Sequence, residues 1–411
     1  MNRSSAIFLI HLAIFPRLVL GADSALPAFS FDAFGTLGLV HSTEDQADFT
    51  ANQLKPATAG FSNSWSADVD SLLGVQVTAN FSDRLTGILQ VISELSSEGN
   101  FEPHVEWANL NYQFTPDFNI RVGRYVLPLF LASPYRKIGF ASSWLRPPVE
   151  LYAMSSITSN DGINATYEMH LGGALNRVQF SIGQLDTEFI DLSKFKARNS
   201  VRIDNTFEYS ALTLHATYSE STLYIDSVKQ LFDGFRQLGA AGIAVAEEYD
   251  SNGGGVVFFS LGANYNPGDW FIAGEWGRSF VEGTLGDPEA WYVSAGYRIG
   301  SVTPYFTFAK SDAKVPPPGA GLDLTALPAD LVPTAEALNK GLADIHYGSP
   351  LQQTYSAGIR WELGARIAVN FQFDHTDLEE NNKGYLINVQ PGFRKGGSFN
   401  LFSASLDFVY P

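Results

Sequence analysis

Residues 67–81 read ADVDSLLGVQVTANF, and their odd and even positions differ in character. Odd positions are mostly apolar, such as Val75 and Val77, whereas even positions are mostly polar, such as Gln76 and Thr78. Side chains of a β-strand point alternately to two faces, so this stretch would present one face to an apolar surrounding and one to water. It therefore predicts an amphipathic strand long enough to cross a membrane.

The same alternation returns along the whole chain from about residue 29. We predict strands at 29–41, 66–80, 85–96, 105–114, 118–126, 162–171, 176–185, 200–209, 211–220, 255–265, 270–281, 289–299, 302–311, 353–363, 366–376 and 399–410. About sixteen strands is an even number within the range of bacterial outer-membrane barrels, and most have the length of about 9–11 residues that a tilted membrane-spanning strand needs.

The connections between these strands alternate between short and long. Short turns are expected near residues 82–83, 115–117, 172–173, 210, 266–269, 300–301 and 364–365, and longer polar links lie between them. A soluble β-sandwich would also show alternating strands, but it has no reason to keep this parity. The pattern favours an all-β, transmembrane antiparallel β-barrel with short periplasmic turns and long extracellular loops.

Aromatic residues gather beside the predicted short turns: Phe81, Phe114, Tyr265, Trp270, Trp361 and Tyr410. Rings with one apolar and one wet edge collect at membrane interfaces, so this placement is typical of an aromatic girdle. The last strand, residues 399–410, is similar to the C-terminal assembly signal of outer-membrane barrels, although Pro411 follows the final aromatic. That similarity implies the barrel-assembly machinery as a partner.

Composition narrows the function classes. The chain has no cysteine, which removes thiolate metal sites and cysteine nucleophiles, and we expect no cofactor or bound metal. A formal net charge of −17 argues against nucleic acid as a partner, because phosphates need a basic surface. No nucleophile motif, phosphate loop or EF-hand loop stands out, so an enzyme is not expected.

The N-terminus predicts export. Arg3 precedes an apolar run that Pro16 and Arg17 interrupt before it reaches the length of a spanning helix, and small or apolar residues follow up to Gly21. We interpret residues 1–21 as a cleaved signal peptide and residues 22–411 as one barrel domain destined for the bacterial outer membrane.

Three stretches carry a resemblance to a known family: residues 121–124 (RVGR), 127–129 (LPL) and 144–152 (WLRPPVELY). With the architecture, they make the mature chain similar to the Gram-negative porin superfamily, in particular its sixteen-stranded branch that includes phosphate-selective porins. The resemblance implies a water-filled channel for passive diffusion of small hydrophilic solutes or ions, outer-membrane lipid and lipopolysaccharide around it, and a homotrimer. No dense lysine ladder is present, so phosphate specificity is not implied.

In porins the third long loop folds into the barrel and narrows the pore, and residues 127–161 are the third long link of this chain. Its prolines stiffen it, because proline lowers the entropy lost on ordering. Fixed charges at a constriction bias which ions enter. The candidate constriction residues are Arg136, Lys137, Arg146 and Glu150.

Charged residues on the predicted inward face of the wall are the second group of candidates. They are Asp68, Asp70, Arg121, Glu168, Arg298, Arg360 and Arg366. Residues 221–254 contain helix-like spacing over 224–232, and within 312–352 Thr334 is suited to cap a short helix, so we expect helices within these two extracellular loops. They leave open an alternative function as a receptor or adhesin that acts through its loops.

Overall fold

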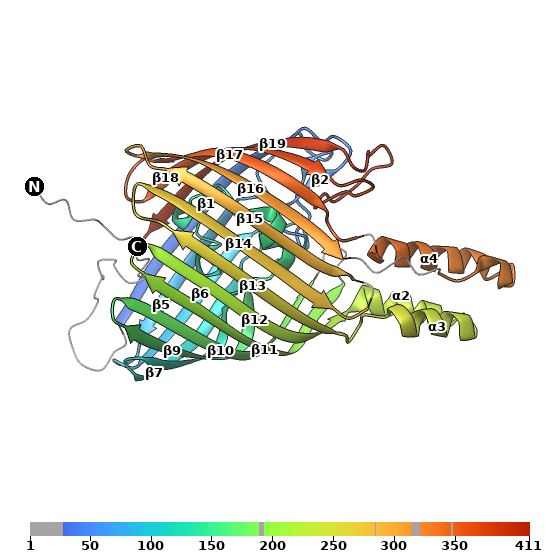
Figure 1. Ribbon diagram of the computed structural model, residues 1–411, viewed down its shortest axis with the longest axis horizontal. Helices are drawn as coiled ribbons and strands as arrows, with labels where there is room; N and C mark the ends of the chain where they lie inside the picture. The colour runs from blue at the N-terminus through green and yellow to red at the C-terminus, as the bar shows by residue number, and fades with distance from the viewer. Residues whose placement is uncertain (1–27, 189–192, 284, 315–320, 347) are drawn as a thin grey trace, which may run out of the picture.

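The computed structural model describes residues 28–188, 193–283, 285–314, 321–346 and 348–411. The predicted signal peptide, residues 1–21, lies outside the described residues. The described chain forms one closed antiparallel barrel (Figure 1).

Sixteen strands form the barrel wall, namely β1 and the fifteen strands from β5 to β19. They are β1 (Ala28–Ser42), β5 (Leu72–Asn80), β6 (Leu85–Glu94), β7 (His104–Thr115), β8 (Phe118–Val126), β9 (Ser159–Leu171), β10 (Ala174–Glu188), β11 (Lys194–Tyr209), β12 (Leu212–Ile225), β13 (Gly255–Tyr265), β14 (Trp270–Val281), β15 (Asp287–Tyr297), β16 (Val302–Lys314), β17 (Gln352–Glu362), β18 (Ile367–Leu378) and β19 (Ser398–Tyr410). Each strand pairs with the next along the chain, and β1 closes the barrel by pairing with both β5 and β19. The predicted fold class and strand number are confirmed.

The parity of the connections is also confirmed. One end of the barrel carries links of at most four residues, such as 81–84 and 172–173, and the other end carries the longer links. The C-terminus lies at the short-turn end (Figure 1).

Several strand boundaries differ from those predicted, and two of these differences bear on the inner loops. Residues 66–71 continue the alternation, but the wall strand β5 begins only at Leu72, and Trp65–Ser66 form a separate short strand, β4, that pairs with β1. The Asp68 side chain instead accepts a hydrogen bond from Thr58 Oγ1 at 2.6 Å, within the first long loop. Strand β9 begins at Ser159, so the third long loop spans 127–158.

The barrel is apolar outside and polar inside. Large apolar side chains such as Phe31, Leu261 and Phe371 are more than half exposed on the outer face. Inward-facing side chains such as Ser260, Thr307 and Asn370 are polar and buried. Exposed apolar surface of this extent is foreign to a water-soluble monomer and suits contact with lipid.

Short strands and helices decorate the long-loop end. The first long loop contains β2 (Asp48–Phe49), β3 (Ala59–Gly60) and β4, and it packs with residues 385–386 of the eighth long loop in one apolar cluster. Helices α2 (Asp226–Arg236), α3 (Gly239–Tyr249) and α4 (Val332–His346) project beyond the rim (Figure 1). Among the described residues, no helix combines the length and the apolar character needed to span a membrane.

The three projecting helices share their own small core. Phe232 and Phe235 of α2 are fully buried, and they pack with the buried residues Ala335 and Leu342 of α4. Helices were expected in these two loops from spacing alone, and the contact between them unites two loops that lie far apart in the sequence.

Candidate functional site: a loop fixed inside the barrel

The third long loop lies inside the barrel, against the wall from β12 onward. Thr217 Oγ1 of β12 donates to the Pro128 carbonyl at 3.1 Å, and Ser260 Oγ of β13 donates to the Leu129 carbonyl. Leu131 N donates to the Glu275 carboxylate of β14 at 2.7 Å. These wall residues occupy inward positions of their strands. Their polar side chains therefore form hydrogen bonds with the loop backbone.

Wall glycines let the loop approach closely. A Cβ atom at Gly262 of β13 would lie only 2.9 Å from the Leu131 side chain, and one at Gly277 of β14 would lie 3.1 Å from Leu151. At both places the loop occupies the space that a larger wall residue would need.

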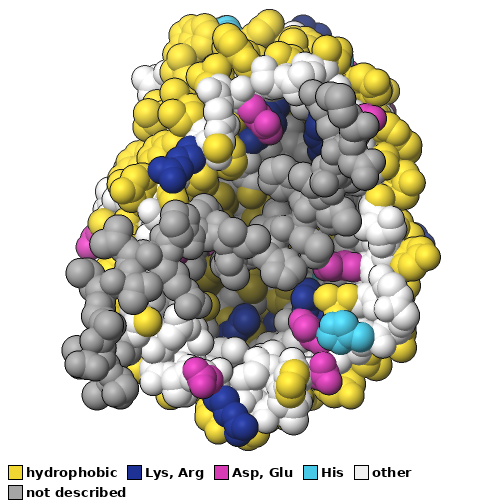
Figure 2. All heavy atoms as spheres, turned by 90° about the vertical axis from the view of Figure 1, so that its left-hand side faces the viewer, with side chains coloured by type: hydrophobic (Ala, Val, Ile, Leu, Met, Phe, Trp, Pro, Cys, Tyr) yellow, Lys and Arg dark blue, Asp and Glu magenta, His cyan; other side chains and the backbone are white. Residues whose placement is uncertain are grey.

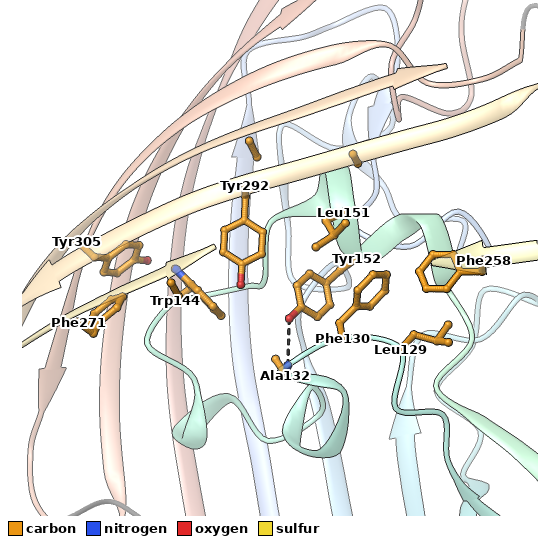
Figure 3. Packing of buried hydrophobic residues seen from close by; sticks show 13 residues of the cluster. Leu129, Phe130, Ala132, Trp144, Leu151, Tyr152, Phe258, Phe271, Tyr292 and Tyr305 are labelled. Atoms are coloured by element: carbon orange, nitrogen blue, oxygen red, sulfur yellow. Dashed lines mark hydrogen bonds between the residues drawn. The ribbon is translucent and has the colours of Figure 1, made fainter. Parts of the chain in front are cut away.

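An aromatic cluster holds the middle of the loop to the wall (Figure 3). Phe130 packs edge-on against Phe258 of β13, and Trp144 packs edge-on against Tyr292 of β15 with ring centroids 5.6 Å apart. The Trp144 indole Nε1 also donates to Ser294 Oγ at 2.7 Å. Aromatic pairs of this kind add to the stabilisation that burial alone provides.

Glu275 is the polar centre of this cluster. The hydroxyls of Tyr152 and Tyr292 donate to the same carboxylate oxygen of Glu275, at 2.6 and 2.7 Å. Burial and then the Glu275 carboxylate raise the pKa of Tyr152 well above its usual value, so its hydroxyl stays protonated and keeps donating. Tyr152 belongs to the short helix α1 (Val149–Tyr152), which begins after Pro148.

Arg146, a predicted constriction residue, is buried in ion pairs with two carboxylates. Its Nε and one terminal nitrogen donate to Asp70 at 3.0 and 2.7 Å, and the other terminal nitrogen donates to Asp374 of β18 at 3.1 Å. Ser403 Oγ of β19 accepts a further bond at 2.7 Å. Burial alone would lower the pKa of Arg146, but the Asp70 and Asp374 carboxylates together raise it, so the guanidinium stays charged.

Glu150, the acidic constriction candidate, is also turned to the wall. Its carboxylate accepts from Gln352 Nε2 at 2.6 Å and from Thr354 Oγ1, both on β17. Tyr385 of the eighth long loop donates to the Glu150 carbonyl at 3.0 Å. Burial raises the pKa of Glu150, and the hydrogen bonds from Thr354 and Gln352 to its carboxylate counter that rise in part. Arg146 and Glu150 thus fasten the loop at two places.

The other two constriction candidates lie on the part of the loop that returns toward β6. Arg136 donates to the Ser155 carbonyl at 2.7 Å and stacks over the Tyr152 ring at 5.3 Å. Lys137 pairs with Glu94, the last residue of β6. Lys55 of the first long loop reaches the other Glu94 oxygen at 2.6 Å.

Two members of this group of charges, Glu94 and Lys55, were not identified from the sequence. Glu94 shares the inward parity of Gln90 and Ile92, so the strand pattern could have identified it. Lys55 carried no such signal, because its position depends on how the first long loop folds back. His104 and Glu106 lie beside the group, with His104 Nε2 3.5 Å from a Glu106 oxygen.

Two of the predicted wall residues, Asp70 and Arg360, hold the third long loop. Asp68 and Asp70 precede β5, and Asp70 holds Arg146. Arg360 of β17 donates to the Phe140 carbonyl at 2.7 Å and so also fastens the loop. Arg298 donates to the Gly268 carbonyl in a short turn at 2.6 Å.

Within the described residues, the remaining three wall candidates form no ion pair or side-chain hydrogen bond with the third long loop. Arg366 lies at a short turn with its guanidinium 5.7 Å from the centre of the Tyr410 ring. Glu168 of β9 pairs with Arg177 of β10 at 2.7 Å. Arg121 lies on the inner face of β8, between Asn111 and Asn164 of the neighbouring strands.

The loop therefore contacts the inner wall from β12 through β19, and it also reaches the long-loop end of β6 at Glu94. The rest of the inner wall from β6 to β11 lies across the barrel from these contacts. Figure 2 views the short-turn end, and it shows that end hollowed, with Lys and Arg side chains within the hollow. An open barrel with a fixed internal loop can pass solutes and discriminate among them by size and charge.

Comparison with solved structures identifies the fold class. The chain aligns with the outer-membrane channel DcaP of Acinetobacter baumannii at 10% identity and a TM-score of 0.56, covering 94% of this chain and 99% of that one. It aligns with an anion-selective porin of Comamonas acidovorans at 11% identity and a TM-score of 0.53, covering 93% and 100%. It aligns with OmpF of Salmonella typhi, in complex with daunomycin, at 11% and 0.53, covering 93% and 98%.

The chain thus has the sixteen-stranded barrel fold of the Gram-negative porins. The sequence matches no family model, and no curated protein is significantly similar to it. At these identities the likeness concerns the fold, so function has to be argued from the site.

Proposed function

We propose that this protein is a porin of the bacterial outer membrane that allows small hydrophilic solutes or ions to diffuse passively. The observation that carries the proposal is the third long loop, which lies inside a closed barrel and is fastened to its wall by Arg146, Glu150 and Tyr152. A barrel that served only to display its outer loops would have no need for such an internal loop.

Selectivity in this proposal comes from charges that remain beside the lumen. Arg146 is matched by two carboxylates, so its role is to hold the loop rather than to attract ions. Arg136 forms no ion pair within the described part of the chain, and Lys55 and Lys137 share the single carboxylate of Glu94. With Glu106 beside this group, three positive side chains face two carboxylates, and the surplus of one positive charge favours anions because a constriction focuses the field.

The rest of the assembly follows from the same proposal. Residues 1–21 direct export and are removed, the barrel-assembly machinery inserts the strands, and lipid and lipopolysaccharide surround the apolar outer face. The protein assembles as a homotrimer. Unheated gel mobility and native mass measurement of the purified protein test this last point.

The deciding experiment is conductance of the purified, refolded protein in planar bilayers. We expect discrete channel openings and a reversal potential that favours anions in a salt gradient. The variant Arg136→Gln/Lys137→Gln should shift the reversal potential toward cations. The matched control is Lys229→Gln/Arg236→Gln, which removes two exposed positive charges from α2 and should shift nothing.

Folded protein that gives no channel openings would overturn the proposal. Equal shifts in the two charge variants would remove the internal loop from the account of selectivity while leaving the channel itself intact.

A further inference from the structure

The inner wall opposite the loop carries a row of amide side chains. Gln90 of β6, Asn109 and Asn111 of β7, and Asn119 of β8 all point inward, because they share the parity of buried wall positions. Their neighbours on the outer face, such as Val122, are exposed and apolar.

Polar atoms in this row lack partners. The side-chain oxygens of Gln90, Asn109, Asn111 and Asn119 are buried and accept no hydrogen bond within the described chain. The same holds for two donors on the same strands, Trp107 Nε1 and Arg121 Nε. A buried polar group without a partner costs free energy. Six such atoms on three adjacent strands therefore indicate a surface that solute or water completes.

Arg121 is the charged centre of this row. It lies level with Asn111 on β7 and two residues from Asn119 on its own strand, which is about 7 Å. Other inward arginines of the wall are paired, as Arg177 is with Glu168 and Arg202 is with Asp204 at 3.5 Å. Over the residues that the structure describes, Arg121 forms neither an ion pair nor a side-chain hydrogen bond.

The row defines the chemistry of a matching solute. One unpaired guanidinium suits a single carboxylate, which it can bind with two parallel hydrogen bonds. The surrounding amides each offer a donor and an acceptor, and a hydroxyl group can meet either. Trp107 adds an N–H donor. It lies four residues before Asn111, the partner of Arg121 on β7, which is about 13 Å along the strand.

We propose that the inner face of β6 to β8 around Arg121 is a binding site for hydroxyl-rich monocarboxylates of sugar size, such as sugar acids. This inference rests on the proposed channel function and names the class of solute that the channel favours. A doubly charged phosphate would need a second unpaired cation at the same place, and the described residues around Arg121 offer none.

Calorimetric titration of the refolded full-length protein in detergent tests the site without any need for conductance. D-glucuronate is the probe, D-glucose has the hydroxyls without the carboxylate, and propionate has the carboxylate without the hydroxyls. We expect each of the last two to bind at least about tenfold more weakly than glucuronate, since each loses one half of the recognition.

Two variants aim at Arg121. Arg121→Gln removes the charge, and Asn119→Asp leaves the arginine in place but provides it with a carboxylate. Both should weaken glucuronate binding at least about tenfold, because each removes the free cation. Arg177→Gln is the matched control on the same wall, and its effect should stay within about twofold because Glu168 already occupies that guanidinium. Unheated gel mobility verifies that each variant is folded.

Equal binding of glucuronate and propionate, or equal loss in Arg121→Gln and Arg177→Gln, would overturn the site. Channels without any glucuronate binding would refute the site and leave the porin function standing. Glucuronate binding without channels would support the site and refute the diffusion function.

Discussion

Replacement of Arg146 by methionine should destabilise the barrel severely. The side chains of Arg146, Asp70 and Asp374 are 6%, 7% and 5% exposed, so three charges lie together away from water. Methionine keeps much of the volume but leaves both carboxylates buried without their cation. Removal of one partner from a buried ion pair typically costs about 3–5 kcal/mol, and here two carboxylates are left behind. We expect a loss in free energy of unfolding in the upper part of that range.

Urea-dependent folding into lipid vesicles, followed by tryptophan fluorescence and gel mobility, measures this loss. The triple variant Arg146→Met/Asp70→Asn/Asp374→Asn removes all three charges, and it should recover most of the stability because no uncompensated charge remains. Arg236→Met is the control, since the Arg236 side chain is 43% exposed and its ion pairs are screened by solvent.

The Arg146 variant should also change the channel. Arg146 is one of the fastenings of the third long loop, so the single variant should show noisier and larger conductance steps where it does fold. A loss of stability below about 1 kcal/mol, typical of a solvated pair, would refute the assignment of Arg146 as a buried anchor. A triple variant no more stable than the single one would refute the electrostatic explanation.

Three further predictions concern the lumen, the wall and the projecting helices. Burial lowers the pKa of Lys55 from 10.5 to about 8, despite the nearby Glu94 carboxylate. Its folded pKa lies below its unfolded pKa, so between these values only the unfolded chain holds the proton, and the Lys55 contribution to stability rises with pH across that window. The lumen loses one positive charge as pH passes 8, so the anion preference, measured by reversal potential, should decline between about pH 7 and 9. This decline should be absent in the Lys55→Met variant and present in the control variant Lys229→Met. Gly262→Val should push Leu131 and its loop into the lumen, which lowers single-channel conductance and destabilises the fold by about 1–3 kcal/mol. The control Gly364→Val lies at a turn with open space and should leave conductance unchanged. Phe235→Ala should loosen only the helices α2 to α4, so limited proteolysis should cut there faster while conductance stays the same; a lost channel would show that the helices support the barrel.

The sequence by itself determined the barrel. Lipid and water lie on opposite faces of every strand, so apolar and polar residue types alternate with a period of two. The residue type at each position therefore shows which face it occupies. The parity of short and long links and the aromatics at the turns are equally local features, and the structure confirms the architecture that they predicted. Even the helices within residues 221–254 and 312–352 could be expected from spacing.

Only the tertiary structure decided what the charged residues contact. Arg146 meets Asp70 and Asp374, which are 76 and 228 residues away in sequence, and no periodicity connects them. The alternation at 66–71 was mistaken for wall strand because a loop packed inside the barrel also has one polar side and one apolar side. Lys55, Glu94 and Lys137 come together only once two loops have folded inward. The strand pattern depends on the surroundings of each single residue, so the sequence predicts it. The partners of a charged residue inside the barrel depend on the path of the loops, so the sequence does not predict them.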